Sequence, residues 1–573
     1  MNTPRLVWDC WERNAKKHSQ SDAIIHWDAL NKPFRWNYAA LHQVALIVAE
    51  NLLAQGVKRG DICALIIRHH KFFYPIYMGI AAVGAIPTVL AYPNPRIHPD
   101  KFVNGLTGIS QKSGLDWVIT ERALETIINP LIRNKNSSLK GSLFALEWLE
   151  NERNKTVNCK TINETHRNTT PSMPFLLQFS SGTTGLQKGI VLSHKAILEH
   201  VKRYSKSMQL SAQDKIVSWL PLYHDMGLIA AFHMPLIYGV PTIQIDPFQW
   251  ISAPMILFQA ISEDRATLSW LPNFAYNFLS ERVYDEDMEG INLSSMRMFI
   301  NCSEVVRSES HEQFLKSFSK YGIKKTMLSA CYAMAETTFA VTQAIPGEEL
   351  AVLTLDRNLL SKRIVKLTDA SNSIKFCASS GKPISGCALK IIDPKGHELA
   401  EDQIGTIAIQ SVSLFDGYRN NPEKTHRVMK DNWYLSGDLG FCHKGEFYIL
   451  GREDDLIIVA GENIYPEDIE DALNKVKGVI PGRVVAFGME DLGTGTQKVC
   501  VIVETSCESE SEKDALKLEI VKAGMAIDVT ISIINFAPPR WLIKSSSGKL
   551  SRKANKERII KNLESEGKYP APH

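Results

Sequence analysis

Helical and strand patterns alternate through most of the chain, and this alternation limits the possible folds more than any other feature. Residues 38–55 and 196–208 carry apolar side chains at helical spacing. Residues 62–67, 242–245 and 266–270 are short apolar runs typical of buried strands. Because helices between strands cover the faces of parallel sheets, the pattern predicts an α/β fold of layered subdomains with mainly parallel sheets.

One apolar segment raises the question of a membrane span. Residues 72–92 carry no charged side chain. A segment of this length could in principle cross a bilayer. Proline and glycine interrupt the segment, so we expect a buried helix up to about Gly84, followed by a buried strand at 86–91. Residues 1–17 are charged throughout and lack the apolar centre of a signal peptide. The sequence therefore predicts a cytoplasmic protein with no membrane span.

The composition argues against two further classes of protein. The 573 residues include 65 basic and 62 acidic side chains, and this near balance is unlike the basic footprint of a nucleic-acid-binding protein. The ten cysteines are scattered singly, with no spacing typical of a zinc site. Such thiols are usual in a reducing compartment.

A change of pattern predicts a domain boundary late in the chain. A glycine, an arginine and three acidic residues at 451–455 precede a new apolar run at 456–459. We expect an N-terminal domain over residues 1–452 and a small mobile α+β domain over residues 453–573. Its predicted elements are a helix at 466–476, strands at 483–487 and 498–504, and a helix at 510–523. Two polar stretches, 151–172 and 362–373, are predicted as loops.

The strongest local motif is the segment FSSGTTGLQKG at residues 179–189. Its glycines allow backbone N–H groups to approach an anion, its hydroxyls add donors, and Lys188 adds a positive charge. It is not a Walker A loop, because Gly189 follows the lysine where a serine or threonine is required. The segment suits a polyphosphate, although a plain surface turn has a similar composition.

Together with later motifs, this loop resembles the phosphate loop of the adenylate-forming superfamily. That superfamily includes acyl-CoA synthetases, peptide-synthetase adenylation domains, luciferases and fatty acyl-AMP ligases. The later motifs follow in the family's order at residues 219–228, 331–337, 434–440, 451–455 and 547–552. The resemblance implies an enzyme that uses ATP and Mg²⁺ to convert a carboxylic acid into its acyl-adenylate and pyrophosphate.

The resemblance also implies a role for each matching residue. The implied nucleotide-binding residues are Ser180, Ser181, Gly182, Thr183, Thr184, Gly185, Lys188, Ser303, Tyr332, Ala333, Asp438 and Arg452. The implied acyl-binding residues are His224, Asp225, Gly227, Asn273, Phe274, Ala333 and Met334. Glu336 and Thr184 are the implied metal ligands, Lys549 and His224 the catalytic residues, and Asp454 the hinge.

Three of these residue types suit a magnesium nucleotide on chemical grounds. Asp438 offers two acceptor oxygens to the paired hydroxyls of a ribose, although an aspartate after Gly437 is also common in turns. Tyr332 can stack on adenine, although a tyrosine taken in isolation is more often a core residue. Glu336 is a hard oxygen ligand suited to Mg²⁺, although an isolated glutamate is usually a solvated surface charge.

Lys549 is the residue best suited to catalysis. Attack of a carboxylate on the α-phosphate brings two anions together, and an ammonium between them stabilises the transition state. The alternative is an ordinary lysine of a basic tail. His224 either polarises the acyl carboxylate or packs in the core. Arg452 reaches the ribose or α-phosphate, or forms a salt bridge at the hinge. In the family, rotation about the position of Asp454 separates adenylation from thiol transfer.

Several details resemble the fatty acyl-AMP ligase branch. They lie at residues 223–228, 272–276, 301–307, 456–459 and 465–470, with additional length near 353–379, where that branch carries an insertion thought to restrain domain rotation. The resemblance implies a fatty acid substrate and transfer to the phosphopantetheine thiol of an acyl carrier protein.

An acyl-CoA synthetase that uses CoA is the alternative. Cys302, Ser303 and Ala333 replace smaller residues usual in the family, and Asp454 resembles the synthetase form. An amino-acid-adenylating enzyme, with Asp225 holding an ammonium, and a catalytically silent nucleotide-binding protein are further alternatives. For the basic tail, 549–568, the sequence leaves two interpretations: it binds an acidic carrier protein, or it forms the solvated face of a helix.

Overall fold

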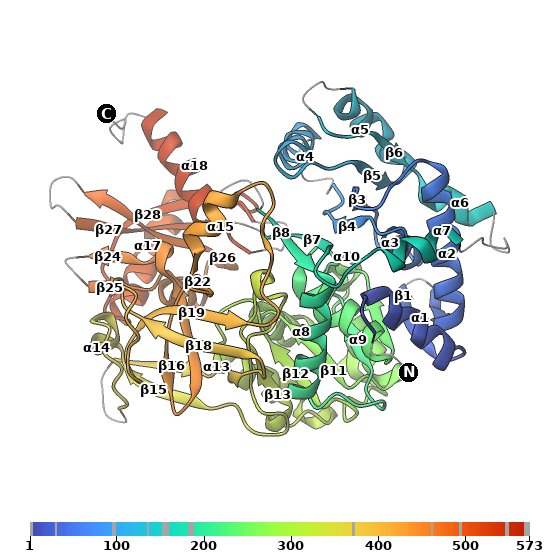
Figure 1. Ribbon diagram of the computed structural model, residues 1–573. Helices are drawn as coiled ribbons and strands as arrows, with labels where there is room; N and C mark the ends of the chain where they lie inside the picture. The colour runs from blue at the N-terminus through green and yellow to red at the C-terminus, as the bar shows by residue number, and fades with distance from the viewer. Residues whose placement is uncertain are drawn as a thin grey trace.

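The structure is a computed structural model that describes residues 4–28, 31–93, 99–133, 137–151, 160–180, 188–368, 373–459, 462–491, 496–544 and 549–565. Helices cover both sides of a central seven-stranded sheet, and a smaller four-stranded sheet lies beside it (Figure 1). The last third of the chain adds antiparallel sheets on the other side of the molecule (Figure 1).

The two N-terminal sheets are parallel, as the alternating pattern predicts, except for the edge strand β2. The seven-stranded sheet has the order β13 (Leu328–Ala330), β12 (Met298–Asn301), β11 (Leu268–Leu271), β9 (Ile216–Ser218), β10 (Thr242–Ile245), β1 (Asp22–Asp28) and β2 (Asn31–Asn37). The four-stranded sheet has the order β4 (Ile86–Val89), β3 (Ile62–Ile66), β5 (Trp117–Thr120) and β6 (Gly141–Leu143).

Helices separate many of these strands along the chain. Asn37 begins the second helix by accepting a hydrogen bond from the backbone N–H of Ala40 at 2.7 Å. The helices of this region are α1 (Val7–Lys17), α2 (Tyr38–Ala54), α3 (Phe73–Ala82), α4 (Pro99–Ser113), α5 (Glu125–Ile132), α6 (Ala145–Asn151), α7 (Lys160–Arg167), α8 (His194–Ser207), α9 (Met234–Tyr238), α10 (Pro247–Ser252), α11 (Ile256–Asp264), α12 (Asn273–Arg282) and α13 (Ser308–Phe318).

The uncharged segment 72–92 forms helix α3 and strand β4, as expected from its proline and glycine residues. Every side chain of α3 is buried inside the protein. The hydroxyl of Tyr77 and Nε2 of His233 lie 2.8 Å apart, so a polar group in this helix is satisfied within the core. Across the described ranges, none of the helices combines the length and apolar character needed to span a bilayer.

One predicted loop is partly wrong. Within residues 151–172 the structure has helix α7, which buries Ile162. The His166 ring lies 2.9 Å from the carbonyl of Ala82, and Arg59 donates to the carbonyl of Asn168 at 2.8 Å. With a single buried apolar residue, α7 lacks the repeated apolar spacing that identifies longer helices, so tertiary contacts decide its structure.

Two antiparallel sheets follow and carry much of the candidate site. The first is β7 (Pro174–Ser180), β8 (Lys188–Ser193) and β20 (Gly417–Tyr418); the second is β18 (Cys387–Ile392), β19 (Gly405–Ser411), β22 (Trp433–His443), β21 (Met429–Lys430) and β23 (Glu446–Arg452). Short pairs are β14 (Thr342–Gln343) with β17 (Lys382–Pro383), and β15 (Val352–Asp356) with β16 (Ile374–Ala378). Helix α14 (Arg357–Ser361) lies between β15 and β16 in sequence, and α15 (Pro422–Val428) lies between β20 and β21.

The C-terminal segment forms its own sheet and hydrophobic cluster. Strands β26 and β27 are antiparallel, whereas β28 joins β27 in parallel. The elements are β24 (Ile457–Val459), β25 (Glu462–Ile464), α16 (Pro466–Asn474), β26 (Val479–Asp491), β27 (Thr496–Thr505), α17 (Glu510–Met525), β28 (Ile531–Ala537) and α18 (Arg552–Ser565). The four predicted elements occur in the predicted order as α16, β26, β27 and α17, and both strands are longer than expected. Strands β24, β25 and β28 were not predicted.

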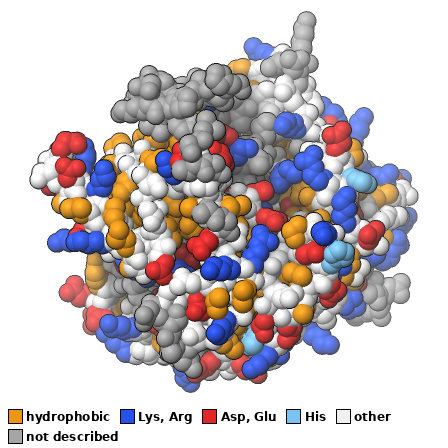
Figure 2. Space-filling model, turned by 90° about the vertical axis from the view of Figure 1, so that its left-hand side faces the viewer, with side chains coloured by type: hydrophobic (Ala, Val, Ile, Leu, Met, Phe, Trp, Pro, Cys, Tyr) orange, Lys and Arg blue, Asp and Glu red, His pale blue; other side chains and the backbone are white. Residues whose placement is uncertain are grey.

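The side of the molecule that carries this segment shows a mixed surface. Basic, acidic and hydrophobic side chains are interspersed there (Figure 2). In the described part of this face, no single sign of charge forms a continuous layer, consistent with the near balance of charge in the sequence.

Candidate active site

Strand pairing brings together two of the predicted nucleotide-binding residues. In the ladder between β22 and β23, Asp438 lies opposite Arg452. Arg452 Nε lies 2.8 Å from one carboxylate oxygen of Asp438, and the hydroxyl of Tyr332 donates to the other. The Arg452 side chain is 51% exposed, and the charge of Asp438 raises its pKa above the usual value. Arg452 therefore forms a salt bridge, but its partner is Asp438, another residue of the predicted nucleotide site.

Glu336 is buried in a short 3₁₀ turn, Ala335–Thr337, and is not a solvated surface charge. One of its oxygens accepts a hydrogen bond of 2.7 Å from the hydroxyl of Tyr418. Burial, followed by the charge of Glu336, raises the pKa of Tyr418, which keeps this hydroxyl protonated as a donor. The tyrosine thus orients the carboxylate.

Strand pairing also places Lys188 beside the tyrosine that orients this carboxylate. Tyr418 in β20 lies opposite Ile190 in β8, the strand that begins at Lys188. The Lys188 ammonium lies 5.5 Å from the centre of the Tyr418 ring. The rest of the predicted phosphate loop falls outside the described residues: Ser181, Gly182, Thr183, Thr184 and Gly185. Ser180 ends strand β7, and its side chain is also outside the description.

The predicted acyl-binding segment contains a close pair of polar side chains. His224 Nδ1 lies 2.7 Å from Asp225 Oδ1, and the backbone N–H of Met226 donates to the same oxygen at 2.8 Å. Burial alone would raise the pKa of Asp225, but His224 and Lys549 outweigh it and hold that pKa below its usual value. His224 is therefore oriented by a carboxylate at the site and is not an isolated core histidine.

Gly227 lies at the start of a π-helical turn, Met226–His233, that follows this pair. A Cβ atom at this position would lie only 2.4 Å from the carbonyl oxygen of Pro221. The turn therefore depends on a residue without a side chain, and π-helical turns are frequent at functional sites.

Lys549 reaches this same region from the far end of the chain. Its ammonium donates a hydrogen bond to the carbonyl of Ser303, and its charge contributes to the lowered pKa of Asp225. Ser303 has φ = 73°, a left-handed conformation uncommon for a residue with a side chain. The structure therefore brings together three residues predicted separately.

The remaining predicted acyl-binding residues lie in different surroundings. The amide of Asn273 accepts from Asn301 Nδ2 at 2.9 Å and from the backbone N–H of Arg307 at 3.0 Å, and it donates to Ser310 Oγ at 3.0 Å. These contacts hold helix α12 against its neighbours. The acyl contact of Asn273 stays a prediction.

The other three side chains remain accessible. Phe274 is 41% exposed, and its ring lies edge-on to Trp219 and Trp250, which stack on one another at 3.6 Å. Ala333 and Met334 are partly exposed, unlike the buried residues on either side of them. Their acyl contacts stay predictions too.

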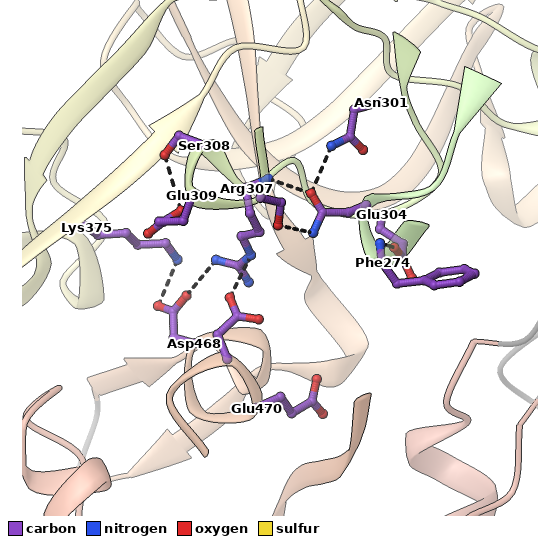
Figure 3. A network of polar contacts seen from close by, with 12 residues as sticks. Phe274, Asn301, Glu304, Arg307, Ser308, Glu309, Lys375, Asp468 and Glu470 are labelled. Atoms are coloured by element: carbon purple, nitrogen blue, oxygen red, sulfur yellow. Dashed lines mark hydrogen bonds and ion pairs between the residues drawn. The ribbon is translucent and has the colours of Figure 1, made fainter. Parts of the chain in front are cut away.

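A buried ion network fixes the C-terminal segment against the rest of the protein (Figure 3). Asp468 in α16 lies 2.8 Å from Lys375, 3.2 Å from Arg357 and 3.5 Å from Arg307. Arg307 also contacts Asp471 at 2.7 Å. Burial opposes ionisation of Asp468, but the three cations hold its pKa below the usual value. The network therefore persists as ion pairs at neutral pH.

The predicted hinge residue, Asp454, is exposed in a short turn, Glu453–Asp455, directly after β23. Its neighbour Asp455 lies 2.8 Å from Arg552, which also contacts Glu467 and Glu470 in α16. The start of α18, three residues after Lys549 in sequence, is thereby attached to α16.

Sequence reasoning missed two residues beside the candidate site: Tyr418, which donates to Glu336, and Lys424, whose ammonium lies 5.7 Å from the centre of the Tyr418 ring. Both lie in the segment GYRNNPEKT at residues 417–425, which is exposed or polar in most positions and shows neither helical nor strand spacing. Only the pairing of β20 with β8 reveals that this segment lies beside Lys188.

Comparisons with known proteins identify the family of this arrangement. The family of AMP-binding enzymes matches residues 11–419. A putative acyl-CoA synthetase from Caulobacter vibrioides is 28% identical over 523 residues, covering 90% of this chain and 88% of that protein. The medium-chain-fatty-acid–[acyl-carrier-protein] ligase JamA from Moorena producens is 27% identical over 543 residues, covering 91% of this chain and 90% of that protein.

A solved structure has the same fold over nearly the whole length. The fatty acyl-adenylate ligase from L. pneumophila, in complex with acyl adenylate and pyrophosphate, is 28% identical, with a TM-score of 0.71. The match covers 97% of this chain and 96% of that one. It confirms the predicted layered α/β fold with an additional C-terminal unit.

Proposed function

The chain belongs to the family of AMP-binding enzymes, and from this premise we propose that it is a fatty acyl-AMP ligase. The proposed reaction joins a fatty acid to the α-phosphate of ATP, forming acyl-adenylate and releasing pyrophosphate. The acyl group is then transferred to the phosphopantetheine thiol of an acyl carrier protein. The similar proteins named for acyl-carrier-protein ligation and for acyl adenylate support this choice.

The observation that carries the proposal is the position of Lys549. Its ammonium contacts the carbonyl of Ser303 and acts on Asp225, between the predicted nucleotide-binding and acyl-binding residues. A cation there can offset the repulsion between a carboxylate and a nucleotide phosphate as they react. Contact with a carbonyl oxygen leaves the other ammonium protons available to a substrate.

The geometry of the charged groups supports the remaining roles that we propose. Asp438 keeps free lone pairs for a ribose while Tyr332 and Arg452 fix its orientation. We assign Arg452 to the nucleotide side of the site and His224, held by Asp225, to the fatty acid carboxylate. The stacking of Tyr332 on adenine, and the contribution of Ala333 and Ser303 to the adenine pocket, belong to the same proposal.

Mg²⁺ fits the donor set at Glu336. In the described ranges, His, Cys, Asp and Glu side chains form no group of three that could hold a metal by themselves. Mg²⁺ in nucleotide enzymes is commonly held by one or two carboxylates together with the phosphates, and Glu336 is a buried carboxylate with one oxygen fixed by Tyr418. Glu336, with Thr184, would hold the ion, which would neutralise phosphate charge.

We propose that the chain divides into a domain of residues 1–452 and a mobile domain of residues 453–573 that turns about Asp454. The Asp468 network supports an arrangement in which this second domain is held for adenylation. Two of its cations, Arg357 and Lys375, lie within the segment 353–379 expected to restrain rotation. A restrained domain favours a carrier protein over free CoA as the acyl acceptor. We also place the enzyme in the cytoplasm.

A substrate and acceptor screen tests the proposal. Fatty acids of graded length are incubated with ATP and Mg²⁺, and acyl-adenylate and pyrophosphate are measured by mass spectrometry and a coupled assay. We expect equal amounts of both products, followed by acyl transfer when a phosphopantetheinylated carrier is added. Failure of every acid to release pyrophosphate would contradict the proposed activity.

Parallel reactions that contain either CoA or the carrier protein identify the acyl acceptor, because the rates of acyl-CoA and acyl-carrier formation can be compared. Faster formation of acyl-CoA than of acyl-carrier would identify an acyl-CoA synthetase, the class named for the relative from Caulobacter vibrioides.

A further inference from the structure

Two lysine side chains converge on one aromatic ring beside Glu336. The ammonium of Lys188 lies 5.5 Å from the centre of the Tyr418 ring, and that of Lys424 lies 5.7 Å from the same centre. The hydroxyl of this tyrosine donates to Glu336 at 2.7 Å. The lysines come from β8 and α15, elements more than 200 residues apart in sequence.

The fold fixes the position of Lys424. Asn421 begins α15 by accepting a hydrogen bond from the backbone N–H of Lys424 at 3.1 Å. The backbone N–H of Tyr418 donates to the hydroxyl of Thr425 at 2.9 Å, which attaches α15 to β20. Gly417, at φ = 127°, leaves room for this contact, because a Cβ atom there would lie 3.2 Å from Thr425. Lys424 is therefore directed at the ring by its helix.

Within the part of the chain that the structure describes, the two lysines form no ion pair with a carboxylate. Among the ion pairs of the described residues, neither Lys188 nor Lys424 contacts an Asp or Glu within 4.0 Å. Burial, followed by the neighbouring Lys188 ammonium, lowers the pKa of Lys424 to about 8. Among the described residues, the charge of Glu336 favours the protonated form of Lys424 but forms no ion pair with either lysine. Two like charges in a partly buried position, without an ion pair in that part of the chain, are a suitable place for an anionic ligand.

We propose that Lys424 and Lys188 together bind the β- and γ-phosphates of ATP and the pyrophosphate that the reaction releases. The inference rests on the proposed adenylation and adds Lys424 as a second cation for the leaving group. Two ammonium groups suit a diphosphate because each can donate to a different phosphoryl unit. Glu336, which accepts the hydrogen bond of the Tyr418 hydroxyl, would hold the metal ion, and that ion would neutralise part of the phosphate charge.

Direct binding of inorganic pyrophosphate tests the inference without any fatty acid. Isothermal titration calorimetry with the full chain and magnesium pyrophosphate compares the wild type with Lys424→Met, Lys424→Arg and Lys430→Met. Lys430 is an exposed lysine of β21, six residues away in sequence, and serves as the matched control. We expect Lys424→Met to weaken binding about tenfold, while Lys430→Met binds within about twofold of the wild type and Lys424→Arg recovers most of the affinity.

Two outcomes would overturn the inference. One is binding by Lys424→Met within about twofold of the wild type when its thermal unfolding is unchanged. The other is an equal loss in Lys424→Arg, because a retained charge should then have preserved the site. If Lys424→Met is destabilised, the Lys424→Arg and Lys430→Met pair still decides whether charge at this position matters.

A steady-state measurement separates this inference from the proposed function. With a fatty acid that is activated, Lys424→Met should raise the KM for ATP about tenfold and leave the KM for the acid unchanged. An enzyme that activates no fatty acid yet loses pyrophosphate binding in Lys424→Met would contradict the function but support the phosphate site. Normal adenylation with an unchanged KM for ATP in this variant would contradict the phosphate site alone.

Discussion

The two clusters of basic side chains near the active site differ in how their charge is balanced. Around Asp468, one buried carboxylate meets Arg307, Arg357 and Lys375, and Asp471 supplies a second acid to Arg307. Around Tyr418, Lys188 and Lys424 share one ring, and the nearby Glu336 already accepts a hydrogen bond from that tyrosine.

The difference separates a structural network from a ligand site. Two unit charges 4 Å apart interact by about 4 kcal/mol at an effective dielectric constant of 20, whereas a cation over an aromatic ring gains about 0.5–2 kcal/mol. Contacts with the ring therefore do not offset the repulsion between two ammonium groups. A bound anion would offset that repulsion. The Asp468 cluster needs no ligand, because each of its cations already faces a carboxylate.

Removing the carboxylate of Asp468 should have the largest effect on stability. Asp468→Ala leaves three cations without their shared partner, and loss of one member of a buried pair typically costs about 3–5 kcal/mol. The free energy of unfolding, measured by chemical denaturation, should fall by that amount. Asp514→Ala, at an exposed position of α17, is the control. An equal effect of both substitutions would show that the network does not hold the C-terminal segment.

The same network has a defined dependence on pH. The pKa of Asp468 lies below the usual value of 3.8 in the folded protein, so its contribution to stability is present at neutral and mildly acidic pH. The contribution should be lost only as the pH falls below that value. A stability difference between wild type and Asp468→Asn that already disappears at pH 5 would contradict this assignment.

Removing the hydroxyl of Tyr418 should have an intermediate effect, which sharpens the comparison at the second cluster. Tyr418→Phe keeps the ring beneath both lysines but leaves Glu336 without its donor, and a hydrogen bond to a charged group contributes about 1.5–3 kcal/mol. We expect the Mg²⁺ concentration for half-maximal adenylation to rise about tenfold or more. Unchanged Mg²⁺ dependence would show that the hydroxyl does not orient the carboxylate.

The smallest expected effect concerns the charge of Lys424 as the pH rises. Its pKa is about 8 in the ligand-free protein, where it faces Lys188, Glu336, Tyr418 and Arg427. Because a bound anion favours the protonated lysine, pyrophosphate affinity should be highest below pH 8 and fall above it. Between pH 7 and 9 the wild type should lose about two- to fivefold in affinity relative to Lys424→Arg, whose guanidinium stays charged. This ratio cancels the titration of pyrophosphate itself. A constant ratio would contradict a titrating lysine at the site.

The sequence predicted the layered fold and the long elements because their apolar spacing is decided locally. Strands such as β3 and β10 are buried throughout, and helix α2 carries a regular apolar pattern with an asparagine at its start. Helix α7 was missed, since one buried isoleucine gives no periodicity. The antiparallel sheets of β7–β8–β20 and β18–β23 were not expected, because strand pairing between distant segments leaves little trace in local patterns.

The motifs gave most of the candidate site but not its internal contacts. Asp438 and Arg452 were both predicted, yet the ladder that pairs them joins separate motifs. Tyr418 and Lys424 lie in a polar segment without a pattern. Their importance follows only from the contacts of Tyr418 with Glu336 and with the two lysines. The structure describes no residue of the loop 181–187, so the predicted phosphate contacts of that loop stay predictions.

Single-turnover formation of acyl-adenylate tests the central claim most directly. Enzyme in excess is mixed with a fatty acid, ATP and Mg²⁺, and acyl-adenylate is quantified over time in wild type, Lys549→Ala and Lys553→Ala. Lys553 is an exposed lysine of α18 and serves as the control. We predict that Lys549→Ala slows formation by about 10²–10³-fold, while Lys553→Ala matches the wild type. A rate for Lys549→Ala within a few-fold of the wild type would contradict the account.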